Sequence, residues 1–187
     1  MEISAKLLKD CQRGDRKAQF QLYKCSYTVL LSVCLRYQQD EASAVAMLNE
    51  GFLKILTNID KYRPETSFVA WTKRIMINTL IDDFRKNRKV KELIESVDFS
   101  STEPTTTNFD WNEADKQFDA EQLEYLIRQL PPMSCKVFNL YAIDGYSHRE
   151  IAELLNISEG TSKWHVSSAR QKLMELLKKS LNTSRVI

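Results

Sequence analysis

Polar side chains near the C-terminus are spaced as in two short capped helices joined by a turn. Ser147 and Glu150 fit a capping box, in which each side chain accepts a hydrogen bond from the backbone amide of the other and a helix begins. Asn156 and Ile157 lie in a three-residue turn, and Ser158 fits the N-cap of a second helix. Two short helices joined in this way predict a helix-turn-helix, a unit that enters the major groove of duplex DNA.

The second helix of this pair predicts a face suited to DNA. Val166, Ala169 and Leu173 recur at helical spacing and are expected to be buried. The positions expected to face outward are donors, cations and an aromatic, namely Lys163, Trp164, His165, Ser167, Arg170 and Lys172. Such side chains suit phosphates and base edges. The alternative is an ordinary helical hairpin whose polar face is solvated.

A second candidate surface combines aromatic and basic residues. Pro64 disfavours a helical conformation at the preceding residue, so a loop is expected over residues 60–65, and Thr66 or Ser67 can begin a long helix. Phe68 and Trp71 open this helix, followed by the polar set Lys73, Arg74, Asn78, Arg85, Lys86, Arg88 and Lys89. Aromatic rings stack on unpaired bases while cations follow the backbone, which favours single-stranded nucleic acid. The alternative is that both rings belong to the core.

The composition offers little for catalysis or for metal binding. The chain has only two histidines, and its cysteines, Cys11, Cys25, Cys34 and Cys135, show no paired spacing. We therefore expect no metal, no cofactor and no small-molecule substrate, and interpret the cysteines as buried free thiols in a reducing cytoplasm. The chain lacks a signal peptide and a run of eighteen apolar residues, which also predicts a cytoplasmic protein.

The elements that must position both surfaces are predicted to be helices. Four glycines and four prolines in 187 residues leave few turns for a sheet, and apolar residues recur at helical spacing. Helices are expected up to about residue 14, over about 18–37 and over about 40–56, before the long basic helix. The predicted fold is all-α, with two small helical domains, residues 1–94 and 122–187, of which the second is the helix-turn-helix domain.

Charge separates the two domains. Residues 1–94 hold 17 Lys and Arg against 11 Asp and Glu, and residues 122–187 hold 9 against 6. Residues 95–121 hold 1 against 8 and are rich in Ser and Thr. This composition predicts a flexible acidic linker. The alternative, a surface loop of one domain, is uncommon at this length.

The basic helix resembles the promoter-melting region of extracytoplasmic-function sigma factors of the sigma-70 family. The residues that carry the resemblance, between Phe68 and Arg85, read Phe-x-Ala-Trp-x-x-Arg-Ile-x-x-Asn-x-x-Ile-Asp-x-x-Arg. Four later groups of residues are similar to the second DNA-binding domain of the family: Leu130-Pro131-Pro132, Val137-Phe138 with Leu140, Gly145-Tyr146-Ser147 and Glu150-Ile151-Ala152. The resemblance covers nearly the whole chain.

The resemblance implies a non-enzymatic subunit that directs core RNA polymerase to promoters, assists promoter melting and is controlled by an anti-sigma factor. It implies minus-ten DNA contacts by Tyr62, Arg63, Phe68, Trp71, Lys73, Arg74, Asn78 and Arg85. It implies minus-thirty-five DNA contacts by Ser158, Thr161, Ser162, Lys163, Trp164, His165, Ser167 and Arg170. Core polymerase would dock on Asn49, Glu50 and Phe52, in a helix that Gly51 is expected to weaken by about 1 kcal/mol relative to alanine.

Two other functions remain open from the sequence. A repressor or activator would use the helix-turn-helix alone and bind free operator DNA at about 10⁻⁸ to 10⁻¹¹ M. A recombinase or nuclease would need catalytic carboxylates, for which Asp82 and Asp83 are the adjacent pair in the basic helix. Neighbours on a helix point about 100° apart, so these two are poor ligands for one shared metal.

Overall fold

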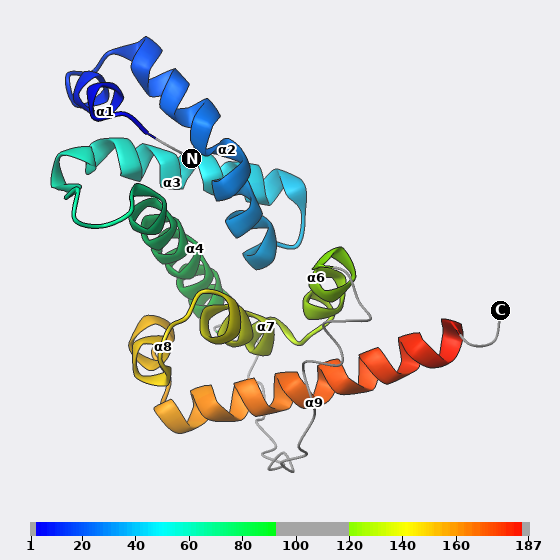
Figure 1. The fold of residues 1–187 in the computed structure, drawn as a ribbon. Coiled ribbons are helices and arrows are strands. Elements are labelled where there is room, and N and C mark those ends of the chain that lie inside the picture. The colour runs from blue at the N-terminus through cyan, green and yellow to red at the C-terminus, as the bar shows by residue number, and fades with distance from the viewer. Residues whose placement is uncertain (1–2, 93–119, 185–187) are drawn as a thin grey trace. The chain divides into compact units, whose positions relative to one another are not determined.

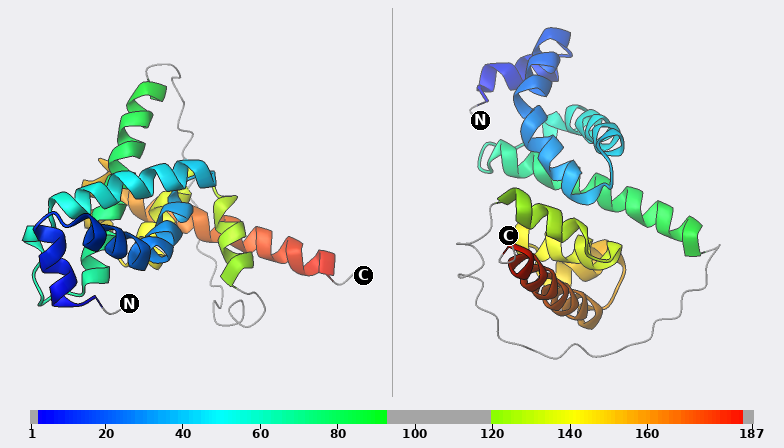
Figure 2. Two further views of the ribbon diagram at one scale, coloured as in Figure 1. Left: turned by 90° about the horizontal axis from the view of Figure 1, so that it is seen from above. Right: turned by 90° about the vertical axis from the view of Figure 1, so that its right-hand side faces the viewer.

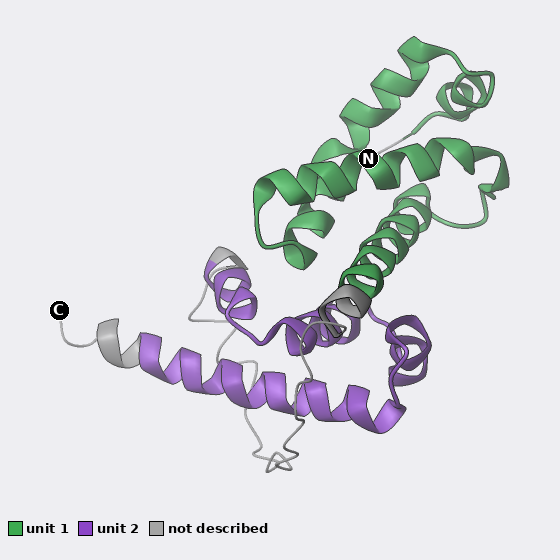
Figure 3. Cartoon of the chain, turned by 180° about the vertical axis from the view of Figure 1, so that it is seen from behind, with its two compact units in different colours: residues 1–95 green, residues 96–187 purple. Residues whose placement is uncertain are grey.

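The computed structural model describes residues 3–92 and 120–184. Every element in these ranges is helical, which confirms the predicted all-α fold (Figure 1). The chain divides into two compact units, residues 1–95 and 96–187 (Figure 3). The predicted acidic linker lies outside the described residues, apart from residues 120 and 121 at its end.

Unit 1 contains a bundle of helices with well-defined starts. Its elements are α1 (Ala5–Gln12), α2 (Arg16–Tyr37), α3 (Glu41–Thr57), the 3-10 turn η1 (Ile59–Lys61) and α4 (Phe68–Glu92). Side-chain oxygens of Ser4, Asp15 and Asp40 cap the first three helices by accepting from backbone amides. The predicted helices match these bounds to within about two residues, whereas the predicted loop over 60–65 begins inside η1. In unit 1, α3 packs against both α2 and α4 (Figure 2).

The contact between α3 and α4 depends on a glycine. A Cβ atom at Gly51 would lie 2.5 Å from Sδ of Met76, a residue of α4 that is fully buried. Gly51 therefore lets the two helices approach closely, in addition to lowering the intrinsic propensity of α3. The sequence shows only the second of these effects.

Unit 2 contains the predicted helix-turn-helix. Its elements are α6 (Ala120–Arg128), α7 (Pro132–Phe138), the π-helical turn η2 (Asn139–Ile143), α8 (His148–Leu155) and α9 (Glu159–Ser184). The Ser147–Glu150 capping box is confirmed at the start of α8. Asn156 ends α8 in the left-handed conformation, with φ of 53°, and turns the chain toward α9. The residues predicted to form the inward stripe of α9, Val166, Ala169 and Leu173, are buried.

The cysteines differ in exposure. Cys11 and Cys34 are buried and Cys135 is partly buried, but Cys25 is exposed on α2, so the prediction that all four thiols are buried is wrong there. Burial raises the pKa of Cys34 to about 12 and also raises the pKa of Cys11 and of Cys135. These three thiols therefore stay protonated at neutral pH and are poor nucleophiles.

Among residues 3–92 and 120–184, no three His, Cys, Asp or Glu side chains are grouped so that they could hold a metal ion. No helix within those ranges is both long and apolar enough to cross a membrane.

Candidate nucleic-acid interface

Three aromatic rings close the loop before α4. The ring centroids of Tyr62 and Phe68 lie 5.1 Å apart, those of Tyr62 and Trp71 lie 5.4 Å apart, and those of Phe68 and Trp71 lie 5.6 Å apart. The hydroxyl of Tyr62 donates to the carbonyl oxygen of Thr66 at 2.9 Å, which folds the loop back on itself. Tyr62 and Trp71 are partly exposed, so each keeps ring surface that a base could reach.

Phe68 lies at the base of this aromatic cluster. It is only 8% exposed, so little of its ring is open to solvent, and its contact with DNA stays a prediction. Its ring packs against those of Tyr62 and Trp71, in the edge-to-face and tilted arrangements that aromatic pairs prefer. The open alternative from the sequence, that the rings are core residues, thus holds for Phe68 and only partly for Trp71.

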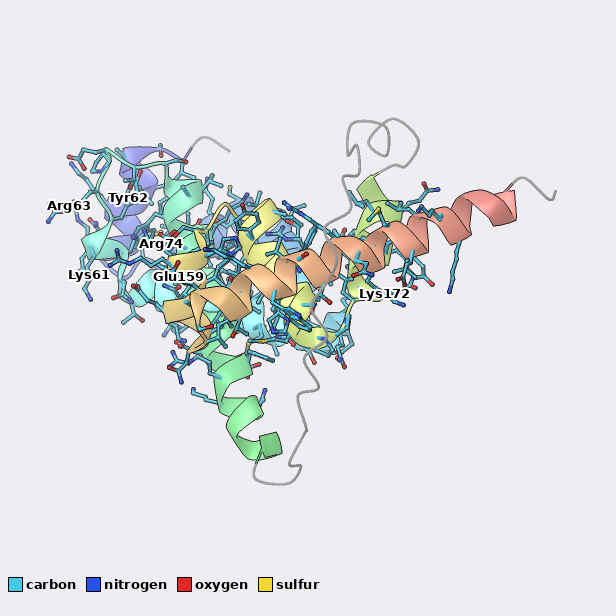
Figure 4. All side chains as sticks on the ribbon, turned by 90° about the horizontal axis from the view of Figure 1, so that it is seen from below. Lys61, Tyr62, Arg63, Arg74, Glu159 and Lys172 are labelled. Carbon is cyan, nitrogen blue, oxygen red and sulfur yellow. The ribbon has the colours of Figure 1, made fainter. Side chains whose placement is uncertain are left out.

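Exposed polar groups lie in the loop before α4 and along α4 beyond the aromatic cluster. Arg63, Arg74, Asn78 and Arg85 are exposed and Lys73 is partly exposed, as predicted for a surface that meets nucleic acid. Figure 4 shows Tyr62, Arg63 and Arg74 in the same part of unit 1. Arg85 lies 3.9 Å from Asp82, and because both side chains are about half exposed this ion pair holds the guanidinium only weakly.

The start of α9 presents the corresponding groups in unit 2. The hydroxyl of Ser158 accepts from the backbone amide of Thr161 at 2.9 Å, which confirms the predicted N-cap. Lys163 and Arg170 are exposed, and Trp164 and Ser167 are partly exposed. These four residues can meet phosphates and base edges without any change in the helix.

Two of the residues predicted to contact the minus-thirty-five element are buried. His165 is 4% exposed, so the prediction that it faces outward is wrong. Ser162, which only the family resemblance placed at the DNA, is fully buried. Both lie on the stripe that Val166, Ala169 and Leu173 continue at three- and four-residue spacing. The sequence pattern misplaced His165 because its polar side chain was assumed to face outward.

Both buried residues are held by polar partners from other helices. Nδ1 of His165 lies 3.0 Å from Oγ of Ser134 in α7, and Nδ1 of His148 in α8 lies 3.0 Å from Oγ of Ser162. The two histidines of the chain therefore connect α9 to α7 and to α8. The sequence offered no signal for these pairs, since their members are far apart in the chain.

The ring of Tyr141 contacts both His148 of α8 and Arg170 on the exposed face of α9. The rings of His148 and Tyr141 are stacked, with centroids 4.4 Å apart and an interplanar angle of 16°. The guanidinium of Arg170 lies 5.9 Å from the centroid of Tyr141, on the periphery of cation–π range. Burial, together with Lys163 and Arg170, lowers the pKa of His148 against a smaller opposing effect of Glu159. His148 is therefore neutral at pH 7 where it stacks on Tyr141, the ring beside Arg170.

Two of the three predicted docking residues of α3 are exposed and the third is buried. Asn49 and Glu50 are exposed, and Glu50 forms an ion pair with Lys54 at 3.1 Å. Phe52 is 7% exposed and its ring packs edge to face on Tyr23, so its role as a direct contact stays a prediction. Leu53 is 65% exposed and is the apolar residue that this face presents.

The comparisons with known proteins agree with this geometry. The sigma-70 region 2 family matches residues 22–90, which include the aromatic cluster, and the sigma-70 region 4 family matches residues 120–173, which include the helix-turn-helix. The two matches together span most of the chain in this order. The chain therefore belongs to the sigma-70 family, among the factors of extracytoplasmic-function type.

Relatives match along most of their length. The chain is 26% identical to the RNA polymerase sigma-H factor of Pseudomonas aeruginosa, over 94% of each chain. It is 27% identical to the ECF RNA polymerase sigma factor SigW of Bacillus subtilis, over 92% of this chain and 96% of SigW. Among solved structures, the sigma factor RpoE of Bartonella quintana, crystallised with the anti-sigma factor NepR, has a TM-score of 0.51 at 20% identity, over 84% of this chain and 95% of RpoE. That last likeness concerns the fold alone.

Proposed function

We propose that this chain directs core RNA polymerase to specific promoters and assists their melting. The observation that carries the proposal is the presence of region 2 and region 4 of the sigma-70 family in one chain and in this order. Each region also carries a surface of the matching chemistry: aromatic and basic in unit 1, and a capped helix-turn-helix in unit 2. The domain bounds we assign are residues 1–94 and 122–187, with residues 95–121 as the linker.

The aromatic cluster and the cations around it bind the minus-ten element. Tyr62 and Trp71 offer ring surface to an unpaired base, while Phe68 holds both rings in place. The side chains that meet the DNA backbone are Arg63, Lys73, Arg74, Asn78 and Arg85. Melting is favoured because a base can stack on these rings only after it has left the duplex.

The first turns of α9 bind the minus-thirty-five element. The groups available to the major groove are Ser158, Thr161, Lys163, Trp164, Ser167 and Arg170. Ser162 and His165 set the position of the helix from behind and do not contact DNA. The N-terminus of α9 adds backbone amides and the positive end of the helix dipole, which favour a phosphate.

The remaining partners follow from the same proposal. Core polymerase docks on the α3 face that contains Asn49, Glu50 and Leu53. An anti-sigma factor controls the protein by covering these surfaces, as a complex of that kind is known for the Bartonella quintana relative. The protein performs no catalysis of its own and acts in the cytoplasm, where polymerase and promoter DNA are found.

Run-off transcription tests the proposal. Core polymerase from the same organism is incubated with a pool of genomic fragments, with and without the protein. New transcripts with discrete start sites are expected, and a Trp71→Ala variant should lose them on duplex templates while retaining transcription from a template with a premelted minus-ten element. Absence of any new transcript, together with tight binding of the protein alone to duplex DNA, would instead indicate a repressor or activator.

A further inference from the structure

A tyrosine of α2 holds the side chain of a predicted docking residue on α3. The hydroxyl of Tyr23 donates to Oδ1 of Asn49 at 2.9 Å, between residues 26 positions apart in the chain. Asn49 is exposed, and an exposed asparagine without such a contact would sample several rotamers. The contact occupies the amide oxygen and leaves the NH₂ group available as a donor.

The ring that supplies this hydroxyl is fixed by its neighbours. The centroid of Tyr23 lies 5.0 Å from that of Phe52, edge to face, and 5.6 Å from that of Tyr27. Burial, aided by Tyr27, raises the pKa of Tyr23, so the hydroxyl keeps its proton. Phe52 therefore contributes to this surface by packing against the ring of Tyr23. This packing fixes the position of the Tyr23 hydroxyl beside Asn49.

The groups next to Asn49 complete a surface of mixed chemistry. Leu53 follows Asn49 by one helical turn, so the two lie on the same face of α3, and Leu53 is 65% exposed. Glu50 lies beside them and forms an exposed ion pair with Lys54. A partner that fits here offers an apolar contact for Leu53 and a hydrogen-bond acceptor for the Asn49 amide.

We propose that Tyr23 is a positioning residue for the docking of core RNA polymerase, acting through Asn49. Its hydroxyl sets the Asn49 amide before binding, so that the NH₂ group donates to an acceptor on the polymerase. An amide ordered in the free protein loses less rotamer freedom on association than a mobile one. This inference rests on the proposed function, because polymerase is the partner that the function supplies.

The test is a double-mutant cycle on the full-length protein, with affinity for core polymerase measured by competition against the labelled wild type. Tyr23→Phe removes only the hydroxyl and is expected to weaken binding by roughly 3- to 10-fold, the range of one hydrogen bond. Asn49→Ala is expected to weaken binding at least as much. Tyr23→Phe should have no further effect in the Asn49→Ala background, because its effect passes through the amide.

Two matched variants separate orientation from packing. Tyr27→Phe removes a hydroxyl from the ring beside Tyr23 and is expected to leave the affinity unchanged. Asn49→Asp keeps an acceptor for Tyr23 but lacks the NH₂ donor, and is expected to bind as weakly as Asn49→Ala. The melting temperature of each variant is measured alongside, and Tyr23→Phe should lower affinity at an unchanged melting temperature.

The outcomes distinguish this inference from the proposed function. Additive losses in the cycle, or a Tyr23→Phe variant that melts earlier yet binds normally, would overturn the role of Tyr23 while leaving polymerase docking intact. A wild-type protein that fails to bind core polymerase at all would overturn the proposed function, and the inference with it.

Discussion

The partners of three buried hydroxyls differ between the two units. In unit 1, Oγ1 of Thr72 donates to the carbonyl oxygen of Phe68, and Oγ1 of Thr79 donates to that of Ile75, each at 2.9 Å and within α4 itself. In unit 2, the hydroxyl of Ser134 pairs with a histidine on another helix. The hydrogen bonds between elements of unit 1, such as Tyr23 to Asn49, are exposed or partly buried, whereas unit 2 buries one between Ser134 and His165.

This difference fits what each surface must do. Apolar packing is non-directional and tolerates small rotations of a helix about its axis. A hydrogen bond requires a narrow range of distance and angle, so the pairs His148–Ser162 and Ser134–His165 restrict how α9 can rotate. A helix that reads base edges needs such a restriction more than a ring that stacks on one unpaired base.

The largest expected effect tests the apolar side of the comparison. Gly51→Leu should lower the free energy of unfolding by about 2 to 3 kcal/mol, because the new side chain would collide with buried Met76. Urea denaturation measures the loss, and hydrogen exchange of α3 and α4 locates it. Gly160→Leu is the matched control, since a Cβ there would meet only Oγ of Ser158 at 3.5 Å. A Gly51 variant as stable as this control would show that α3 and α4 have room to adjust.

The polar side of the comparison is tested at His165. Its replacement by alanine should lower the free energy of unfolding by about 2 kcal/mol, because it opens a cavity and leaves the Ser134 hydroxyl unpaired. Lys163→Ala, at an exposed position of the same helix, should leave stability unchanged. It should instead weaken duplex binding and reduce the logarithmic salt slope by about 0.9 if the ammonium meets a phosphate.

Denaturation and DNA binding at several salt concentrations, measured on both variants, distinguish the roles. A His165→Ala protein with wild-type stability and a reduced salt slope would support the prediction that this imidazole faces DNA.

The sequence predicted the apolar stripes of both units better than their polar and close contacts. Helical periodicity finds apolar stripes, so the helix bounds and the buried Val166, Ala169 and Leu173 were predictable. The outward placement of His165 rested on its polar side chain, and its partner Ser134 comes from a distant part of the chain. Contacts between helices that depend on a missing side chain, as at Gly51, are equally invisible to periodicity.

The candidate site shows a similar division. Exposed cations such as Arg63 and Arg74 were predictable because a charge is seldom buried without a partner. Aromatic residues were harder to place, since Phe52 and Phe68 are buried and Leu53, which the prediction passed over, is exposed. Whether a ring supports a surface or belongs to it is decided by neighbours such as Tyr23 and Tyr62.

A smaller effect is expected at a feature that the sequence predicted in full. Ser147→Ala should lower the free energy of unfolding by about 1 kcal/mol, because the amide of Glu150 at the start of α8 loses its acceptor. Glu153→Ala, which removes an exposed ion pair with Arg149, should change stability by less than about 0.5 kcal/mol. Equal losses in the two variants, measured by urea denaturation, would contradict the importance of the cap over surface charge.

The smallest effect concerns pH, and it sharpens the comparison because unit 2 holds both histidines. Burial, with Lys163 and Arg170, lowers the pKa of His148 below its ordinary value of 6.5. Below pH 6.5 the unfolded chain therefore takes up a proton on His148 that the folded chain does not yet bind. The free energy of unfolding should fall as pH drops from 6.5 toward the lower folded pKa, and His148 should contribute no further change below it.

His148→Gln should reduce this loss, and because the variant keeps His165, the difference between the two proteins isolates His148. Urea denaturation at pH 7.5, 6.5 and 5.5 measures it. Glutamine can still hydrogen-bond with Ser162 but cannot titrate, so the variant separates the charge of His148 from its contact. Identical pH profiles for variant and wild type would mean that the stacked imidazole holds α8 against α9 equally well in either protonation state.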